Sequence, residues 1–191
     1  MQNLSTQLKK AFDAYFEAPI EAWEEFAAHC EPMIHRKDEV LKKQGNSEKY
    51  FYFIEKGSVG VFLWKENNFV CLDFAFDGQF CCDYMSVLTE EPNDLELVAL
   101  ETTKVHRMTV ENFRKLGDKS IGQILMRKSA ESSFVDKQKQ QIDLLTKSSE
   151  ERYRELCQRF PKVELRVAQK HIASYLGITP QSLSRLRRKH A

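Results

Sequence analysis

The side chains best suited to recognition chemistry lie near the end of the sequence, in the stretch HIASYLGITPQSLSRLRRK (residues 171–189). The amide of Gln181 can pair bidentately with adenine, and the guanidinium of Arg185 can pair bidentately with guanine. The other hydroxyl and cationic groups of this stretch suit phosphate oxygens; they are Thr179, Ser182, Arg187, Arg188 and Lys189. These residue types predict contacts with nucleic-acid bases and with the phosphate backbone.

Two short helices joined by a sharp turn would place these side chains on one surface. Gly177 is expected to end the first helix, because glycine adopts a positive φ at little cost. Thr179 is expected to cap the second helix, and Pro180 to occupy its first turn. Apolar residues would face inward; they are Ile172, Ala173, Tyr175, Leu176, Ile178, Leu183 and Leu186. This pattern is typical of a helix-turn-helix, whose second helix lies in the major groove of DNA.

The set of expected DNA contacts also includes Gln169, two residues before this stretch. Its members are Gln169, Thr179, Pro180, Gln181, Ser182, Arg185, Arg187, Arg188 and Lys189. A helical hairpin without a partner can also have a glycine at its turn and charges outside, so that alternative stays open.

The charge of the chain is uneven, although its net value is only +1. Residues 148–191 contain ten Lys and Arg against four Glu, a net charge of +6, which leaves −5 for the remainder. A basic end on an acidic body is expected where one end meets a polyanion. A solvated basic face without a partner is the alternative.

Composition narrows the class of protein. The apolar share is 42% and the charged share 30%, and no apolar run is long enough to cross a membrane. The N-terminal residues lack the apolar core of a signal peptide, which predicts a cytoplasmic protein. The cysteines show no CxxC spacing and are expected to be reduced thiols, with no disulfide framework and no metal site; they are Cys30, Cys71, Cys81, Cys82 and Cys157.

The segments before this C-terminal stretch predict three kinds of element. Apolar spacing over residues 4–29 favours two amphipathic helices. Short aromatic and β-branched runs separated by turn residues, from 39 to 109, favour a barrel or sandwich of strands. Residues 119–147 suit one long helix.

That helix has a seam with alternating steps of three and four, as in a two-stranded coiled coil. The seam consists of Ile121, Ile124, Lys128, Glu131, Val135, Gln138, Ile142 and Leu145. Packing on the strand domain of the same chain would give a similar period, so a homodimer and intramolecular packing both remain open. A capping box from Ser148 to Glu151 would start the next helix, and VELRVAQ (163–169) is expected to be a strand or an extended arm.

At this point the sequence resembles the Crp/Fnr family of transcription regulators over nearly its whole length. IASYLGITPQSLSR resembles the helix-turn-helix of that family, and LKKQGNSEKYFYFIEKGSVGVF (41–62) resembles the first strands of its cyclic-nucleotide-binding β-roll. The resemblance implies an α+β fold: a jelly-roll-like double-stranded β-roll with flanking helices (1–118), a dimerisation helix (119–147) and a winged-helix-type helix-turn-helix domain (148–191). It also implies a homodimer, and RNA polymerase as a further candidate partner.

The family members that bind cyclic AMP use a Gly-Glu pair for the ribose and an Arg-Ser or Arg-Thr pair for the phosphate. Aligned on Gly78, these positions fall at Cys82-Asp83 and near Asn93-Asp94, and Arg is absent from 65 to 106. A cyclic phosphate would face acidic side chains without a cation, so we expect no response to cyclic AMP and an unknown effector. The resulting degenerate pocket comprises Gly78, Cys82, Asp83, Tyr84, Asn93 and Asp94.

Cofactor chemistry finds little support. Only Cys30 precedes the strand region, which disfavours an iron–sulfur cluster, and His29, His35 and His106 are the only residues to nominate for haem. Cys81 and Cys82 are expected to be buried thiols more than a redox switch. We expect no cofactor, although a pocket for an apolar ligand stays open.

These features favour a homodimeric, sequence-specific DNA-binding regulator that is not an enzyme. A cupin-like metalloenzyme lacks ligands, because the strand region holds a single histidine, His106. A nucleotide- or small-ligand-sensing signalling module without DNA binding is the main alternative.

Overall fold

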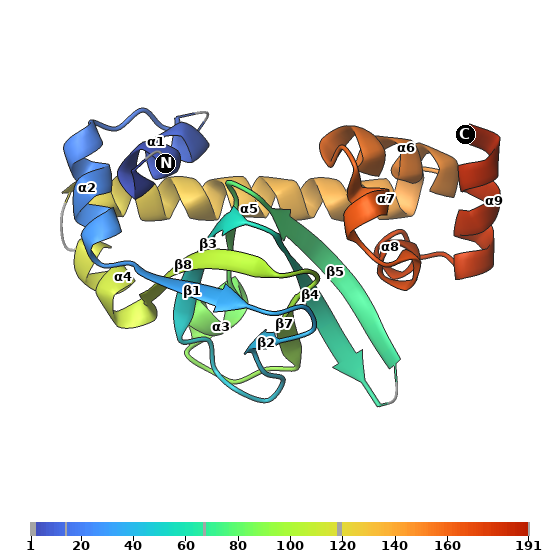
Figure 1. The fold of residues 1–191 in the computed structure, drawn as a ribbon, viewed down its shortest axis with the longest axis horizontal. Helices are drawn as coiled ribbons and strands as arrows, with labels where there is room; N and C mark the ends of the chain where they lie inside the picture. Colours follow the sequence, from blue (N-terminus) through green and yellow to red (C-terminus); the bar gives the residue numbers. More distant parts are fainter. Residues whose placement is uncertain (1–2, 14, 67, 118–119, 191) are drawn as a thin grey trace.

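The computed structural model describes residues 3–13, 15–66, 68–117 and 120–190. A long helix, α5 (Ser120–Thr146), runs along the molecule, with the N-terminal helices at one end, the C-terminal helices at the other and the strands along one side (Figure 1). In these described ranges, no helix is long and apolar enough to cross a membrane.

The N-terminal end is helical, as the spacing predicts. Helices α1 (Leu4–Phe12) and α2 (Ile20–Ala28) pack on each other and bury Leu8 and Trp23 completely. The ring of Phe12 lies 5.0 Å from that of Trp23 and 5.0 Å from that of Phe80 in the strand region. Aromatic contacts therefore attach this helical pair to the strands.

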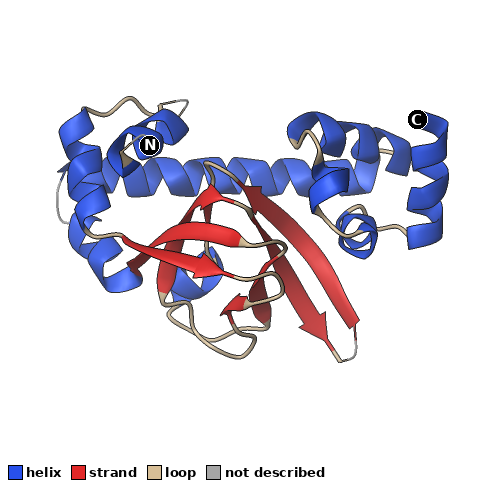
Figure 2. Cartoon of the chain, in the orientation of Figure 1, coloured by secondary structure: helices blue, strands red, loops and turns tan. Residues whose placement is uncertain are grey.

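The strand region forms a β-roll of two four-stranded antiparallel sheets, with strand orders β1-β8-β3-β6 and β2-β7-β4-β5. Figure 2 shows these strands between the helices of the two ends. The strands are β1 (Glu31–His35), β2 (Val40–Lys42), β3 (Tyr50–Lys56), β4 (Ser58–Lys65), β5 (Asn68–Phe76), β6 (Phe80–Cys81), β7 (Leu95–Ala99) and β8 (Thr103–Thr109). Helix α3 (Tyr84–Thr89) interrupts them, and α4 (Val110–Gly117) leads to α5. The predicted α+β fold with a β-roll and flanking helices is confirmed.

The C-terminal end contains α6 (Ser149–Arg159), α7 (Val163–Arg166), α8 (Gln169–Tyr175) and α9 (Pro180–His190). The predicted capping box is present: Ser148 accepts a hydrogen bond from the Glu151 N–H, and Glu151 accepts one from the Ser148 N–H. This box ends the run of α5 and starts α6.

One expectation for this end is wrong. VELRVAQ is not a strand, because Val163 and Val167 lie four residues apart and are buried on one side of a helical turn that begins after Lys162, at φ 70°. The described residues 148–190 contain helices and connecting turns, and the winged form of this domain stays a prediction.

One hydrophobic cluster joins the C-terminal helices to the roll. It combines Phe62, Cys71, Phe74, Phe76 and Leu100 of the strand region with Tyr153, Leu156, Phe160, Val163, Val167, Ile172, Ala173, Leu176 and Leu183. The helical end therefore buries its apolar faces against the outer side of β4 and β5 as well as against itself.

Candidate functional site

The turn between α8 and α9 has the local contacts that the sequence predicts. Gly177 has a φ of 64°, which ends α8, and the Ile178 N–H donates a 3.0 Å hydrogen bond to the Ala173 carbonyl. Thr179 caps α9 by accepting a 3.1 Å hydrogen bond at Oγ1 from the Ser182 N–H. Leu183 on α9 is fully buried between the helices. These local contacts fix the crossing of the two helices.

The structure leaves the outer face of α9 open to solvent. Most of the predicted DNA contacts are exposed; they are Gln169, Thr179, Pro180, Gln181, Arg185, Arg188 and Lys189. Ser182 and Arg187 are half-buried. Arg187 Nε lies 2.6 Å from Glu164 Oε1, and Lys189 Nζ lies 2.7 Å from Glu150 Oε2. Arg185 and Gln181 are thus exposed on α9, whereas Arg187 and Lys189 are each engaged by a carboxylate.

Helix α8, in contrast, has its own outer face covered by the roll. Ser174 Oγ accepts a 2.9 Å hydrogen bond from the N–H of Cys71 on β5. The ring of His171 lies 4.8 Å from that of Phe62 and 5.2 Å from that of Phe69, in edge contacts. Burial lowers the pKa of His171 to about 4, so its ring is neutral in this interface at pH 7.

The positions Cys82-Asp83 and Asn93-Asp94, here called the cassette, were expected to lack a cation. The structure places the ammonium group of Lys42, from strand β2, beside them. Lys42 on β2 is buried, and its Nζ lies 2.9 Å from Asp83 Oδ2. The same ammonium group donates to Asn93 Oδ1 at 2.9 Å and to the Leu95 carbonyl at 2.7 Å. The expectation that no cation faces Asp83 is wrong, because Lys42 reaches it from a distant part of the sequence.

Glu48 extends this buried network. Its carboxylate accepts hydrogen bonds from the N–H groups of Lys49 at 2.9 Å, Tyr50 at 3.1 Å and Asp83 at 2.9 Å. Burial raises the pKa of Glu48 above its ordinary value, although these backbone donors oppose the shift. Asp83 also caps α3 by accepting a 3.1 Å hydrogen bond from the Ser86 N–H. The polar groups of the cassette are therefore bonded to one another and to neighbouring protein groups.

The structure does not gather all the predicted pocket residues. Gly78 lies in a turn at the other end of β3, where its N–H donates to the Ile54 carbonyl at 2.8 Å. Asp94 is exposed and accepts from Gln44. Cys82 packs with the N-terminal cluster, as does Tyr84. Only Asp83 and Asn93 meet at Lys42.

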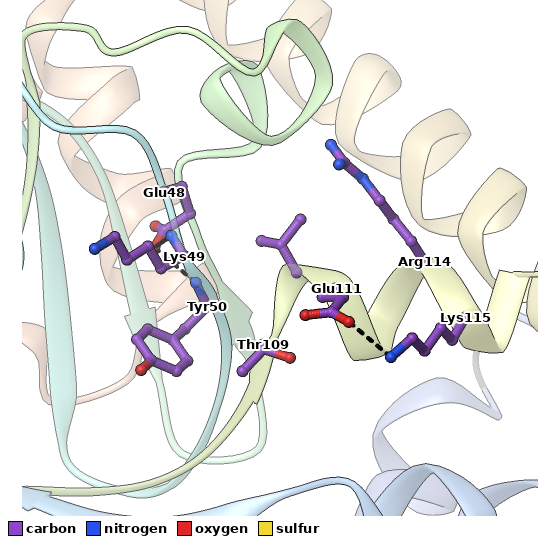
Figure 3. A pocket seen from close by; sticks show the side chains of 8 residues that line it. Glu48, Lys49, Tyr50, Thr109, Glu111, Arg114 and Lys115 are labelled. Carbon is purple, nitrogen blue, oxygen red and sulfur yellow. Dashed lines mark hydrogen bonds and ion pairs between the residues drawn. The ribbon is translucent and has the colours of Figure 1, made fainter.

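An open pocket of about 550 Å³ lies beside this network, between the start of β3 and helix α4 (Figure 3). Its lining includes the backbone-bonded Glu48, the pair Glu111 and Lys115, at 2.7 Å, and Arg114. Arg114 pairs with Glu90 at 2.9 Å and donates to the Val87 carbonyl. These four charged groups thus already have protein partners, whereas Lys49 of the same lining is exposed.

The cysteines and histidines agree with a structural role. Cys81 and Cys82 are free thiols, and burial raises the pKa of both. His106 Nε2 lies 2.7 Å from Glu55, and His29 is exposed. Among the residues that the structure describes, no cluster of His, Cys, Asp and Glu could hold a metal ion.

The seam of α5 is unpartnered over its second half. Val135 is 47%, Ile142 54% and Leu145 77% exposed. Lys128 and Ile124 are half-buried, and Gln138 is exposed; the side chain of Ile121 lies outside the described residues. A different side of the helix meets the rest of the chain, where Gln140 donates to Tyr175 Oη at 3.4 Å. Intramolecular packing therefore does not account for the seam between 135 and 145.

Residues 33–120 match the family model described as the cyclic nucleotide-binding domain. This stretch of the chain is thus similar to the cyclic nucleotide-binding domain. Three solved structures share the fold of most of the chain. CLP of Xanthomonas campestris, described as a c-di-GMP responsive global regulator, is 16% identical, with a TM-score of 0.68 over 90% of this chain and 91% of its own. FixK2 of Bradyrhizobium japonicum is 19% identical, with a TM-score of 0.70 over 84% of this chain and 83% of its own.

A CooA mutant of Carboxydothermus hydrogenoformans is 17% identical, with a TM-score of 0.66 over 95% of this chain and 83% of its own. A search of curated proteins gave no match to the sequence. At these identities the likeness is one of fold alone.

Lys42 and Arg166 are the important residues that sequence reasoning missed. Lys42 ends the short strand β2 and is buried, whereas Lys43 follows it and is exposed. Nothing in the sequence distinguishes these two lysines. Arg166 was counted within the basic charge of the C-terminal end, yet it pairs with Asp77 and Glu101 of the roll. No local pattern marks either pairing, because the partners lie far away in the sequence.

Proposed function

We propose that this protein is a non-enzymatic, sequence-specific DNA-binding transcription regulator that acts as a homodimer on a two-fold symmetric operator and does not respond to cyclic AMP. The observation that carries the proposal is the position of helix α9. The turn at Gly177 and the cap at Thr179 attach it to α8 and leave Gln181, Arg185 and Arg188 exposed on one basic surface. In this proposal residues 1–118 form the sensor-like domain, 119–147 the dimerisation helix and 148–191 the DNA-binding domain. RNA polymerase remains a candidate partner.

The homodimer is supported by the exposed apolar side chains Val135, Ile142 and Leu145 on one stripe of α5. Two copies of this stripe would bury each other across a two-fold axis. Such a dimer presents two copies of α9, which matches a symmetric operator with half-sites about one helical turn apart.

The test is fluorescence anisotropy with random duplex DNA over a salt series, followed by selection of a preferred operator. We expect the logarithm of affinity to fall steeply with the logarithm of salt concentration, because each phosphate contact releases counterions. Arg185→Ala should lose affinity, whereas Lys10→Ala, an exposed cation on α1 at the opposite end, should not (Figure 1). Absence of salt-dependent binding in the parent would exclude DNA and favour a signalling module.

A further inference from the structure

Arg166 on α7 anchors the C-terminal end to the roll. Its Nε donates to Glu101 Oε1 at 2.9 Å, its Nη1 to Asp77 Oδ2 at 2.6 Å and its Nη2 to the Gly57 carbonyl at 2.8 Å. The guanidinium carbon also lies 4.9 Å from the centre of the Phe76 ring. One side chain therefore uses donors on all three nitrogens and its flat face against the roll.

The acceptors of Arg166 come from separate turns at one end of the roll. Gly57 lies between β3 and β4, Asp77 follows β5, and Glu101 lies between β7 and β8. These turns are braced against each other, since Asp77 accepts from the Gly57 N–H at 2.9 Å and Glu101 accepts from Ser58 Oγ at 2.8 Å. Burial alone would raise the pKa of Asp77, but the hydrogen bonds from Gly57 and Arg166 outweigh it and hold that pKa below its ordinary value. The carboxylate of Asp77 is thus ionised and forms an ion pair with Arg166.

Ser174 supplies a second attachment, at an edge strand. Strand β5 is the last in its sheet, so part of its backbone has no neighbouring strand. Ser174 Oγ accepts from the Cys71 N–H at 2.9 Å and lies 3.5 Å from the Phe69 carbonyl. The hydroxyl of α8 thereby satisfies a backbone donor of the roll.

These two attachments determine where α9 lies. Helix α9 packs on α8 through the fully buried Leu183, so it follows any movement of α8. The covalent link between α5 and α6 is a short turn at Lys147 and Ser148, where Lys147 pairs with Asp143 on α5 and with Glu155 on α6. Contacts with the roll add to this restraint on the C-terminal helices.

We propose that Arg166 and Ser174 are positioning residues that hold α9 in one orientation against the roll, and so fix the separation of the two reading helices in the dimer. The inference rests on the proposed function and adds to it the device that selects the spacing between operator half-sites. Their role in binding is geometric, since neither residue is placed on the outer face of α9.

The test uses the full-length protein and a set of operators whose half-site separation is lengthened or shortened by one or two base pairs. The parent should lose roughly tenfold or more in affinity on the shifted operators, as a rigid reader does when it loses base contacts. Arg166→Ala and Ser174→Ala should bind the shifted operators within about threefold of the best one, because a released α9 adapts to each separation. Each variant should also keep its preference for the bases within one half-site.

Two matched variants separate positioning from charge. Arg154→Ala removes an exposed arginine from α6 in the same C-terminal end and should retain the sharp spacing profile of the parent. Asp77→Ala removes an acceptor of Arg166 without lowering the basic charge of the DNA-binding end, and should broaden the profile as Arg166→Ala does.

Hydrogen exchange measured by mass spectrometry reports docking without DNA. In Arg166→Ala, amides in residues 69–76 should exchange about tenfold faster or more, while β7 in the same sheet exchanges as in the parent. Faster exchange at β5 together with an unchanged, sharp spacing profile would overturn the positioning role and leave the proposed function intact. Failure of the parent to bind any duplex would overturn both the proposed function and the positioning role. If Arg166→Ala does not fold, spacing profiles as sharp as that of the parent in Ser174→Ala and Asp77→Ala would still overturn the positioning role.

Discussion

Lys42 Nζ lies 2.9 Å from Asp83 Oδ2, and the two side chains are 2% and 0% exposed. The ammonium group of Lys42 forms this ion pair with Asp83 and donates hydrogen bonds to Asn93 Oδ1 and to the Leu95 carbonyl. In the cassette of a cyclic nucleotide-binding domain, the protein has thus neutralised its own buried carboxylate. A cyclic phosphate entering here would have to displace Asp83 from its ion pair with Lys42.

We predict that Lys42→Met lowers the free energy of unfolding by about 3–5 kcal/mol, because it leaves the carboxylate of Asp83 buried without its cation. Urea denaturation followed by circular dichroism measures this loss. The double variant Lys42→Met, Asp83→Asn removes both charges and keeps an oxygen that can cap α3, so it should recover most of the stability. If Lys42→Met is as stable as the parent, the ion pair does not stabilise the cassette.

We predict that cyclic AMP does not stabilise the protein. A ligand present at about 100 times its dissociation constant raises the free energy of unfolding by about 2.7 kcal/mol, which a thermal unfolding experiment detects readily. Cyclic AMP at about 1 mM should therefore leave Tm unchanged if the affinity is weaker than millimolar. A clear rise in Tm that is absent in a variant of the cassette, such as Asn93→Ala, would show that the site accepts the nucleotide.

We predict different effects for two cations of α9. Arg185→Ala should weaken binding to a selected operator by about 1–3 kcal/mol and relax the preference at one base pair, because Arg185 is exposed where base edges would lie. Lys189→Ala should weaken binding to all sequences to a similar extent and reduce the salt slope by about one. Competition binding with single-base operator variants distinguishes the two, and parent-like behaviour of both would refute the assigned roles.

We predict that an acidic residue in the exposed seam separates the dimer. Ile142→Glu or Leu145→Glu would place a carboxylate in an apolar interface, and the dimer dissociation constant should rise at least about thirtyfold. Sedimentation equilibrium measures the constant. Lys139→Glu, an exposed position of the same helix outside the seam, is the matched control and should remain dimeric. A monomeric parent would instead require another cover for Val135, Ile142 and Leu145.

Features determined by local chemistry were the ones predictable from sequence. The positive φ of Gly177, the Thr179 cap and the Ser148 capping box each depend on residues within a few positions of one another. Strands β1 and β6 were missed because the first contains Pro32 and the second has two residues, so neither shows a clear alternation.

Contacts between distant segments were beyond sequence reasoning. Lys42 meets Asn93 across 51 positions and Arg166 meets Gly57 across 109, and neither pair has a motif. Tyr175 was expected only in the core of a helical pair and His171 was given no role, whereas both contact the roll, Tyr175 with its ring 5.1 Å from that of Phe74. The outward side of a helix carries no sign of which surface will cover it.

The ring of His171 makes the docked interface sensitive to pH. Burial is the largest cause of its lowered pKa; Lys170 and Lys37 lower it further, and Asp38 opposes them. Because the folded protein favours neutral His171, the stabilisation is full above the unfolded pKa of 6.5 and declines as the pH falls from there toward about 4. We therefore predict that the urea midpoint decreases between pH 7 and pH 5.

The matched variant for this prediction is His171→Phe, which keeps a ring between Phe62 and Phe69 but cannot take up a proton. Its midpoint should fall less over the same interval. Some slope should persist, because burial also lowers the pKa of His35, while the nearby Glu39 opposes that shift. Asp77 adds nothing in this interval, since its pKa lies below its ordinary value of 3.8 and its contribution is lost only at still lower pH. Equal slopes in the parent and in His171→Phe would show that docking of α8 does not depend on the neutral form of His171.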